Sequence, residues 1–205
     1  FPPSLREARA ALLLVAGVLY KLGLPFAQIA RELAATDPVD GRLQTVEPAV
    51  SLPAHAARGP LVVVDYAHTP DALSRALLAL RAVATARSGR LVCLFGCGGE
   101  RDPGKRPVMG AIAAELADHV VVSSDNPRTE SPEAIVQQIL AGIPEAVRAD
   151  VEVDRARAIL QTIWAASPED VLLLAGKGHE TYQDIGGEKL PFDDREWARV
   201  ALLLQ

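Results

Sequence analysis

Short apolar runs alternate with longer amphipathic segments over most of the 205-residue chain. Four runs show almost no polar alternation, which is typical of parallel strands that are covered on both faces. These predicted strands are Leu61–Val64, Leu91–Phe95, Val120–Val122 and Val171–Leu174. A segment with helical periodicity follows each run, so the pattern predicts right-handed βαβ units. The expected fold class is α/β, with a Rossmann-like, open, mainly parallel sheet and helices on both faces.

The first part of the chain has a different pattern. Two helical segments, residues 5–22 and 26–35, follow one another without a predicted strand between them. The composition changes just after them, so we place a domain boundary after residue 39. Two helices are too short to bury a core of their own. Residues 1–39 are therefore expected to be a helical piece of a neighbouring domain, and residues 40–205 a complete ligand-binding domain.

Local signals mark helix starts and one turn. Thr69–Asp71 and Ser131–Glu133 each combine a capping hydroxyl, a proline at the first helical position and an acid near the positive end of the helix dipole. Asp193 followed by Glu196 predicts a capping box before the last helix. Two glycines between short extended segments predict a β-hairpin within residues 182–192.

Charge and cysteine content exclude several classes of protein. The formal net charge of −5 argues against a surface that binds nucleic acid or an anionic membrane. The apolar stretch of residues 8–24 is interrupted by Arg9 and Lys21, so it predicts neither a membrane span nor a targeting signal. Cys93 and Cys97 form no disulfide framework, and neither is expected to be a catalytic thiol. A cytoplasmic location is the default expectation.

Polar segments follow all four predicted strands. In an open α/β sheet, ligands bind at the carboxyl ends of the strands. The segments found there are Asp65–Asp71, Gly96–Pro107, Asp125–Glu130 and Gly176–Glu180. Together they predict a polar crevice for a small molecule that carries both positive and negative groups.

The second segment contains an incomplete phosphate-binding motif. Gly99–Lys105 has the spacing G-x-x-x-x-G-K, but Arg106 stands where Ser or Thr would hold magnesium. Pro103 lacks an N–H donor, and Glu100 and Asp102 place negative charge where a phosphate would lie. A P-loop is therefore not predicted, although the glycines allow the backbone to approach a ligand closely.

Several side chains in these segments suit a zwitterionic ligand. Arg101 is a candidate carboxylate clamp, with a solvent-exposed arginine as the alternative. Asp125 could bind a cation and Arg128 an anion, although the two could equally pair with each other. Glu180 offers a second cation partner, and His68 suits either a ligand or a structural hydrogen bond. The spacing matches no metal site, Ser-His-Asp order or nucleophile elbow, so these residues alone leave the reaction open.

These four segments, together with Gly41-Arg42, resemble the carboxyl-terminal domain of the Mur ligases, most closely the MurE-type members. The resemblance covers about residues 15–205. It implies a cytoplasmic, ATP-dependent amide ligase of peptidoglycan synthesis. ATP would phosphorylate the terminal carboxyl group of UDP-MurNAc-L-Ala-D-Glu, and the amine of a diamino acid would attack the acyl phosphate. The last domain of such enzymes supplies the amino-acid pocket and one wall of the nucleotide site.

The resemblance also implies residue roles. The substrate amino acid would be bound by residues of the last three segments, namely Arg101, Asp125, Asn126, Pro127, Arg128, Gly176 and Glu180. Arg42, Asp65 and His68 would face the nucleotide. The order Asp-Asn-Pro-Arg resembles the members that add meso-diaminopimelate, in which Arg128 would bind the carboxylate that distinguishes this amino acid from L-lysine.

Some family features have no counterpart in the sequence. The central ATPase domain of the family carries a P-loop, a magnesium-binding acid and a carbamylated lysine, and its asparagine motif is not found at residues 1–4. ATP and Mg²⁺ are therefore expected to be bound mainly by the central domain, and the chain alone to hydrolyse no ATP. The N-terminal and central domains are expected partners of this chain. A lysine-adding or folylpolyglutamate-type ligase, a non-catalytic amino-acid-binding module and a scaffold are the alternatives.

Overall fold

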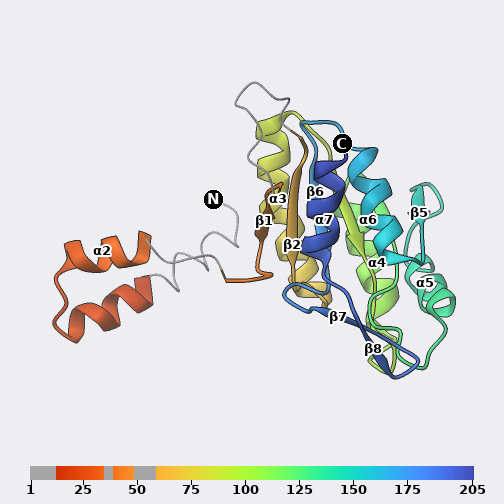
Figure 1. Cartoon of the computed structure of the whole chain (residues 1–205), viewed down its shortest axis with the longest axis horizontal. Helices are drawn as coiled ribbons and strands as arrows, with labels where there is room; N and C mark the ends of the chain where they lie inside the picture. The colour runs from red at the N-terminus through yellow and green to blue at the C-terminus, as the bar shows by residue number, and fades with distance from the viewer. Residues whose placement is uncertain (1–12, 35–38, 49–58) are drawn as a thin grey trace. The chain divides into compact units, whose positions relative to one another are not determined.

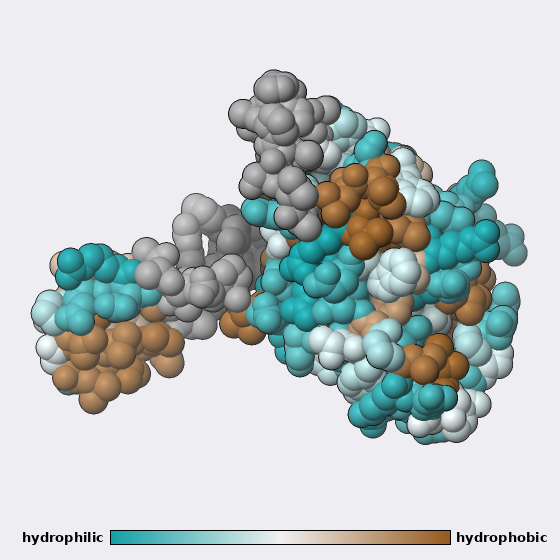
Figure 2. All heavy atoms as spheres, viewed as in Figure 1, coloured by the Kyte–Doolittle hydropathy of each residue, from teal (hydrophilic) through white to brown (hydrophobic). Residues whose placement is uncertain are grey.

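A computed structural model of the chain describes residues 13–34, 39–48 and 59–205 (Figure 1). The chain divides into two compact units, Phe1–Val39 and Asp40–Gln205. In the first unit, residues 13–21 are helical and helix α2 spans Phe26–Ala34. Most large apolar side chains of its described part are exposed, and Figure 2 shows them as an apolar surface. No helix within the described ranges is long and apolar enough to cross a membrane.

The second unit is built on a six-stranded sheet with the order β1-β2-β6-β3-β4-β5. Its strands are β1 (Gln44–Val46), β2 (Leu61–Asp65), β3 (Leu91–Phe95), β4 (His119–Val122), β5 (Ala149–Val151) and β6 (Val171–Ala175). β1 and β2 are antiparallel, and all other neighbouring pairs are parallel. The predicted fold class is confirmed, and the four predicted strands are the four central ones.

Helices cover both faces of this sheet (Figure 1). They are α3 (Pro70–Arg87), α4 (Lys105–Leu116), α5 (Pro132–Leu140), α6 (Arg155–Trp164) and α7 (Asp194–Leu203). Alternate strand residues enter two separate cores: Leu173 belongs to the core that contains residues of α3, α4 and α5, whereas Leu172 belongs to the core that contains residues of α6 and α7. Both faces are therefore buried, which explains why the central strands lack polar alternation.

The predicted helix starts are formed mostly as expected. Thr69 and Ser131 cap α3 and α5, each by accepting a hydrogen bond from a backbone N–H three residues later. Asp193 caps α7, but the expected capping box is wrong in its second half. Glu196 forms an ion pair with Arg199 instead of reaching back to the cap. A charged partner one helical turn away competes with the backbone N–H for that carboxylate.

The predicted hairpin is present as β7 (Tyr182–Ile185) paired with β8 (Glu188–Pro191). The edge strands β1 and β5 were not predicted. Each has three residues and a neighbour on one side only, so neither needs the apolar run that identified the central strands. In β5, two of the three side chains are exposed.

Candidate functional site

The carboxyl ends of β2, β3, β4 and β6 border a cavity of about 830 Å³ in the second unit. All four polar segments contribute to its walls. The lining residues include Tyr66, His68, Gly98, Arg101, Asp102, Lys105, Asp125, Asn126, Arg128, Gly176, Glu180 and Tyr182. Three acidic and three basic side chains are among them, so the cavity offers partners for groups of either charge. This is the strand-end cavity.

Six of the seven residues assigned to an amino-acid ligand line the strand-end cavity. The seventh, Pro127, is not among the lining residues. Its carbonyl oxygen lies against Gly99, where an added Cβ would come within 1.9 Å of it. Pro127 therefore shapes the loop between β4 and α5, while its neighbours Asn126 and Arg128 reach the cavity.

Asn126 and Glu180 come from different loops and meet inside the cavity. The Asn126 Nδ2 atom donates a hydrogen bond to Glu180 Oε2 at 2.8 Å. Lys177, which sequence reasoning did not single out, connects the same two residues: its Nζ donates to Asn126 Oδ1 at 3.0 Å and to Glu180 Oε2 at 3.3 Å. The signal available in the sequence was a lysine between two glycines at a strand end, a pattern that by itself says nothing about burial.

Asp125 pairs with Lys177 and not with Arg128. Asp125 Oδ1 lies 3.6 Å from the Lys177 ammonium and has no hydrogen-bond partner. Burial raises the pKa of Asp125, and the positive charges of Lys177 and Arg155 oppose that shift. The carboxylate is thus held at the cavity wall with spare acceptor capacity, which suits an ammonium group.

Arg128 is held by the hairpin. Its backbone N–H donates to the Asp184 carbonyl at 2.9 Å, and its own carbonyl accepts from Gly186 at 2.7 Å. Its φ of 53° places it in the left-handed region, and its guanidinium donates to the carbonyl of Gly99. The backbone contacts with β7 stabilise this uncommon conformation and direct the side chain to the cavity, with further N–H groups available for an anion.

Arg106 explains why the incomplete P-loop motif ends in arginine. Its side chain is 1% exposed, and its guanidinium donates to both carboxylate oxygens of Glu130 at 2.8 and 3.0 Å. It also donates to the Gly98 carbonyl at 3.0 Å and to Gln138 at 2.8 Å. Arg106 therefore ties the loop after β3 to α5, a structural role in which Ser or Thr could not replace it.

Two of the three residues assigned to the nucleotide are arranged around the Tyr66 ring. The Arg42 guanidinium lies 4.8 Å from the ring centroid and the His68 ring 4.6 Å from it. Asp65 accepts a hydrogen bond from the Leu43 backbone N–H at 2.7 Å, next to Arg42, and burial raises the pKa of its carboxyl group. Of the three, His68 lines the strand-end cavity.

Tyr66, which sequence reasoning also missed, connects the residues assigned to the nucleotide with Glu180, which is assigned to the amino acid. Its hydroxyl lies 3.5 Å from Glu180 Oε1, a long hydrogen bond.

The backbone around Tyr66 needs glycine at two positions. Gly41 has a φ of 65°, and a Cβ there would lie 2.1 Å from the His179 backbone nitrogen. Gly178 has a φ of 53°, and a Cβ there would lie 2.6 Å from the Tyr66 side chain.

Neither cysteine is placed for catalysis. Cys93 and Cys97 are buried, and burial raises the pKa of each thiol to about 12. Because the thiolate is the reactive form, we expect neither to be alkylated by iodoacetamide in the folded chain at neutral pH, and both to react after unfolding in guanidinium. Mass spectrometry measures the label. Rapid labelling of Cys97 in the folded chain would contradict its burial.

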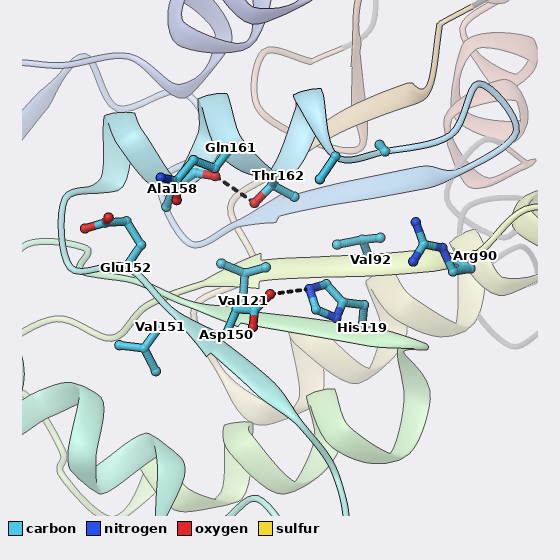
Figure 3. Close-up of a pocket in the computed structure, with 12 residues that line it drawn as sticks. Arg90, Val92, His119, Val121, Asp150, Val151, Glu152, Ala158, Gln161 and Thr162 are labelled. Carbon is cyan, nitrogen blue, oxygen red and sulfur yellow. Dashed lines mark hydrogen bonds and ion pairs between the residues drawn. The ribbon is translucent and has the colours of Figure 1, made fainter.

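A second cavity, of about 340 Å³, lies between β5 and α6 (Figure 3). Val92 and Val121 contribute apolar surface from β3 and β4, and His119 Nε2 lies 3.0 Å from Asp150 Oδ2. This cavity contains none of the residues that the sequence singled out. Within the described ranges, no group of three or more His, Cys, Asp or Glu side chains is placed to hold a metal ion in either cavity.

Comparison with known proteins assigns the family. A family model described as the Mur ligase, glutamate ligase domain matches residues 41–178. The chain belongs to this family. It is 52% identical over 181 residues to the UDP-N-acetylmuramoyl-L-alanyl-D-glutamate--2,6-diaminopimelate ligase of Acidovorax sp. (strain JS42), a match that covers 88% of the chain and 34% of that relative.

Two solved structures share the fold of the chain. A structure of a UDP-N-acetylmuramoyl-L-alanyl-D-glutamate--2,6-diaminopimelate ligase is 37% identical, with a TM-score of 0.71, and the match covers 92% of this chain and 37% of that one. A folylpolyglutamate synthase/dihydrofolate synthase of Yersinia pestis, complexed with AMPPNP and a Mn ion, shares the fold with a TM-score of 0.54 and 21% identity, over 92% of this chain and 37% of that one. The chain thus spans about a third of the length of the proteins it matches.

Proposed function

We propose that this chain is the carboxyl-terminal, amino-acid-binding part of an ATP-dependent ligase. The ligase would join meso-diaminopimelate to UDP-MurNAc-L-Ala-D-Glu in cytoplasmic peptidoglycan synthesis. ATP would transfer its γ-phosphoryl group to the D-Glu carboxylate, which releases ADP. An amine of diaminopimelate would then attack the acyl phosphate carbon, and the amide would form as phosphate and a proton leave. The name of the Acidovorax relative supports the same amino acid.

The observation that carries this proposal is the charge arrangement of the strand-end cavity. Arg128 and Arg101 line it together with Asp125 and Glu180. Diaminopimelate has two carboxylates and two amines, so it needs both kinds of partner at both ends. In our assignment Asn126, Gly176, Glu180 and Arg101 bind the reacting end. Asp125 and Arg128 bind the distal end.

The nucleotide roles are assigned on the same basis. His68 borders the strand-end cavity, and Arg42 lies over the ring of Tyr66, whose hydroxyl contacts Glu180. These contacts support a nucleotide role for Arg42 and His68 next to the residues assigned to the amino acid. Asp65 holds the backbone beside Arg42. ATP and Mg²⁺ would be bound mainly by the central domain, to which we also assign the helical residues 1–39. The AMPPNP and manganese of the Yersinia pestis structure support these co-substrates.

Competition between amino acids tests the proposal. The full-length ligase would be supplied with UDP-MurNAc-L-Ala-D-Glu, ATP and equal amounts of meso-diaminopimelate, L-lysine and L-glutamate, and the product identified by mass. We expect the diaminopimelate adduct. A product that contains only lysine or glutamate would favour the lysine-adding or folylpolyglutamate-type alternative. Tight, nucleotide-independent binding of diaminopimelate to a protein that forms no amide would indicate a non-catalytic binding module.

A further inference from the structure

Lys177 is fully buried next to three residues that line the strand-end cavity. Its side chain is 0% exposed, and its ammonium contacts Asn126, Glu180 and Asp125 at 3.0, 3.3 and 3.6 Å. Its charge also lies 5.7 Å from the centroid of the Tyr182 ring. A buried lysine is costly unless it is paired and hydrogen-bonded, so these contacts account for its presence there. Each of its three polar partners lines the cavity.

The contacts of Lys177 determine how Asn126 is oriented. Asn126 Oδ1 accepts from Lys177 and from the Asp184 backbone N–H, both at 3.0 Å. The amide nitrogen is therefore the atom that faces Glu180, where it donates to Oε2 at 2.8 Å. Glu180 Oε2 thus has two donors, whereas Oε1 has the distant Tyr66 hydroxyl at 3.5 Å and retains acceptor capacity for an ammonium group.

Lys177 also compensates the negative charge of the cavity wall. Four charged groups act on Asp125 from the elements around it. Burial raises the pKa of Asp125, Lys177 and Arg155 lower it, and Glu180 and Asp194 raise it further. Removal of the lysine charge would leave two carboxylates close together with less compensation, so that Asp125 would take up a proton more readily. A protonated Asp125 would no longer attract an ammonium group.

We propose that Lys177 is a positioning residue for the amino-acid substrate. It holds Asn126 and Glu180 in one arrangement and keeps the Asp125 carboxylate available for an ammonium group. It acts through these three residues and need not touch the substrate. The inference rests on the proposed function and adds a residue on which recognition of the substrate depends.

The test is the variant Lys177→Met in the full-length ligase, because methionine retains most of the length without the charge. We expect the KM for meso-diaminopimelate to rise by on the order of 100-fold, as expected when one partner of a buried charge network is removed. The KM values for ATP and for UDP-MurNAc-L-Ala-D-Glu should change by less than about threefold, since Lys177 contacts Asn126, Glu180 and Asp125 and none of the residues assigned to the nucleotide.

The pH dependence separates this role from a purely structural one. In Lys177→Met the pKa of Asp125 is raised further, so the carboxylate is protonated at low pH and ionises as the pH increases. The KM for meso-diaminopimelate, relative to the parent enzyme, should therefore be largest at the acidic end of the assay range and decrease as the pH rises. Adding Asp125→Asn removes the titrating group. The double variant should keep a high KM without this pH dependence. It should also recover part of the thermal stability that Lys177→Met loses, because the unpaired buried carboxylate is then absent.

Lys189→Met is the matched control. Lys189 is exposed and also lies over the Tyr182 ring, with Nζ 4.3 Å from the centroid. This substitution should leave all three KM values near those of the parent. The inference is overturned if Lys177→Met behaves like the control, or if all three KM values rise together without a change in pH dependence. Failure of the parent enzyme to use diaminopimelate would instead contradict the proposed function, before any variant is tested.

Discussion

Arg128→Ala should remove most of the preference for meso-diaminopimelate over L-lysine in the full-length ligase. The two amino acids differ by the distal carboxylate, and Arg128 lines the cavity with a guanidinium suited to a bidentate contact with that group. A site built around such a polar contact can reject the analogue that lacks it by roughly 10⁴-fold, because the buried partner is then left unpaired. We expect the ratio of kcat/KM values for the two amino acids to decrease by up to that factor.

Most of the decrease in the kcat/KM ratio should come from a lower kcat/KM for meso-diaminopimelate. Arg128→Lys keeps a positive charge without the planar fork, so it should retain part of the preference. Arg148→Ala is the matched control, because the Arg148 side chain is 92% exposed and paired at a long 3.8 Å with Asp150. An unchanged ratio in Arg128→Ala, measured with the same substrate preparations, would contradict the assignment of Arg128 to the distal carboxylate.

Arg155→Met should destabilise the chain by about 3–5 kcal/mol, the range found when one partner of a buried ion pair is removed. Arg155 and Asp194 are both 0% exposed, and the guanidinium donates to the two Asp194 oxygens at 2.8 and 2.7 Å. It also donates to the carbonyls of Ser124 and Ala175, directly before Asp125 and Gly176. The variant would leave a buried carboxylate and two carbonyl groups without their donor.

Urea unfolding of the 205-residue chain measures this loss. Arg157→Met on the same helix is the control: Arg157 is 67% exposed and lies 3.5 Å from Glu152, so its removal should cost less than about 1 kcal/mol. Adding Asp194→Leu to Arg155→Met should recover part of the stability, since the unpaired charge is then absent while the carbonyl groups still lack a donor. Equal unfolding midpoints for the two single variants would contradict the role of Arg155.

The central part of the fold was predictable because its strands are buried on both faces. Val171–Ala175 is apolar at every position, and so are most residues of the strands beside it. This unbroken run of apolar residues is the pattern that identifies a strand buried on both faces. The two edge strands are short and half-exposed, so their residues are under no such constraint and the pattern does not reveal them. The second half of the expected capping box failed because Arg199 competes for Glu196.

The amino-acid sequence was sufficient to indicate where the candidate site lies, because parallel strands place the loops at their carboxyl ends along one edge of the sheet. Arg101, Arg128 and Glu180 could be found by that rule. Which of these groups pair with each other was decided by the tertiary structure. Asp125 could have paired with Arg128, three residues away, but burial places it beside Lys177 instead. Burial and cross-loop distances are collective properties of packed elements, so the contacts of Tyr66 and Lys177 with the candidate site could be found only in the tertiary structure.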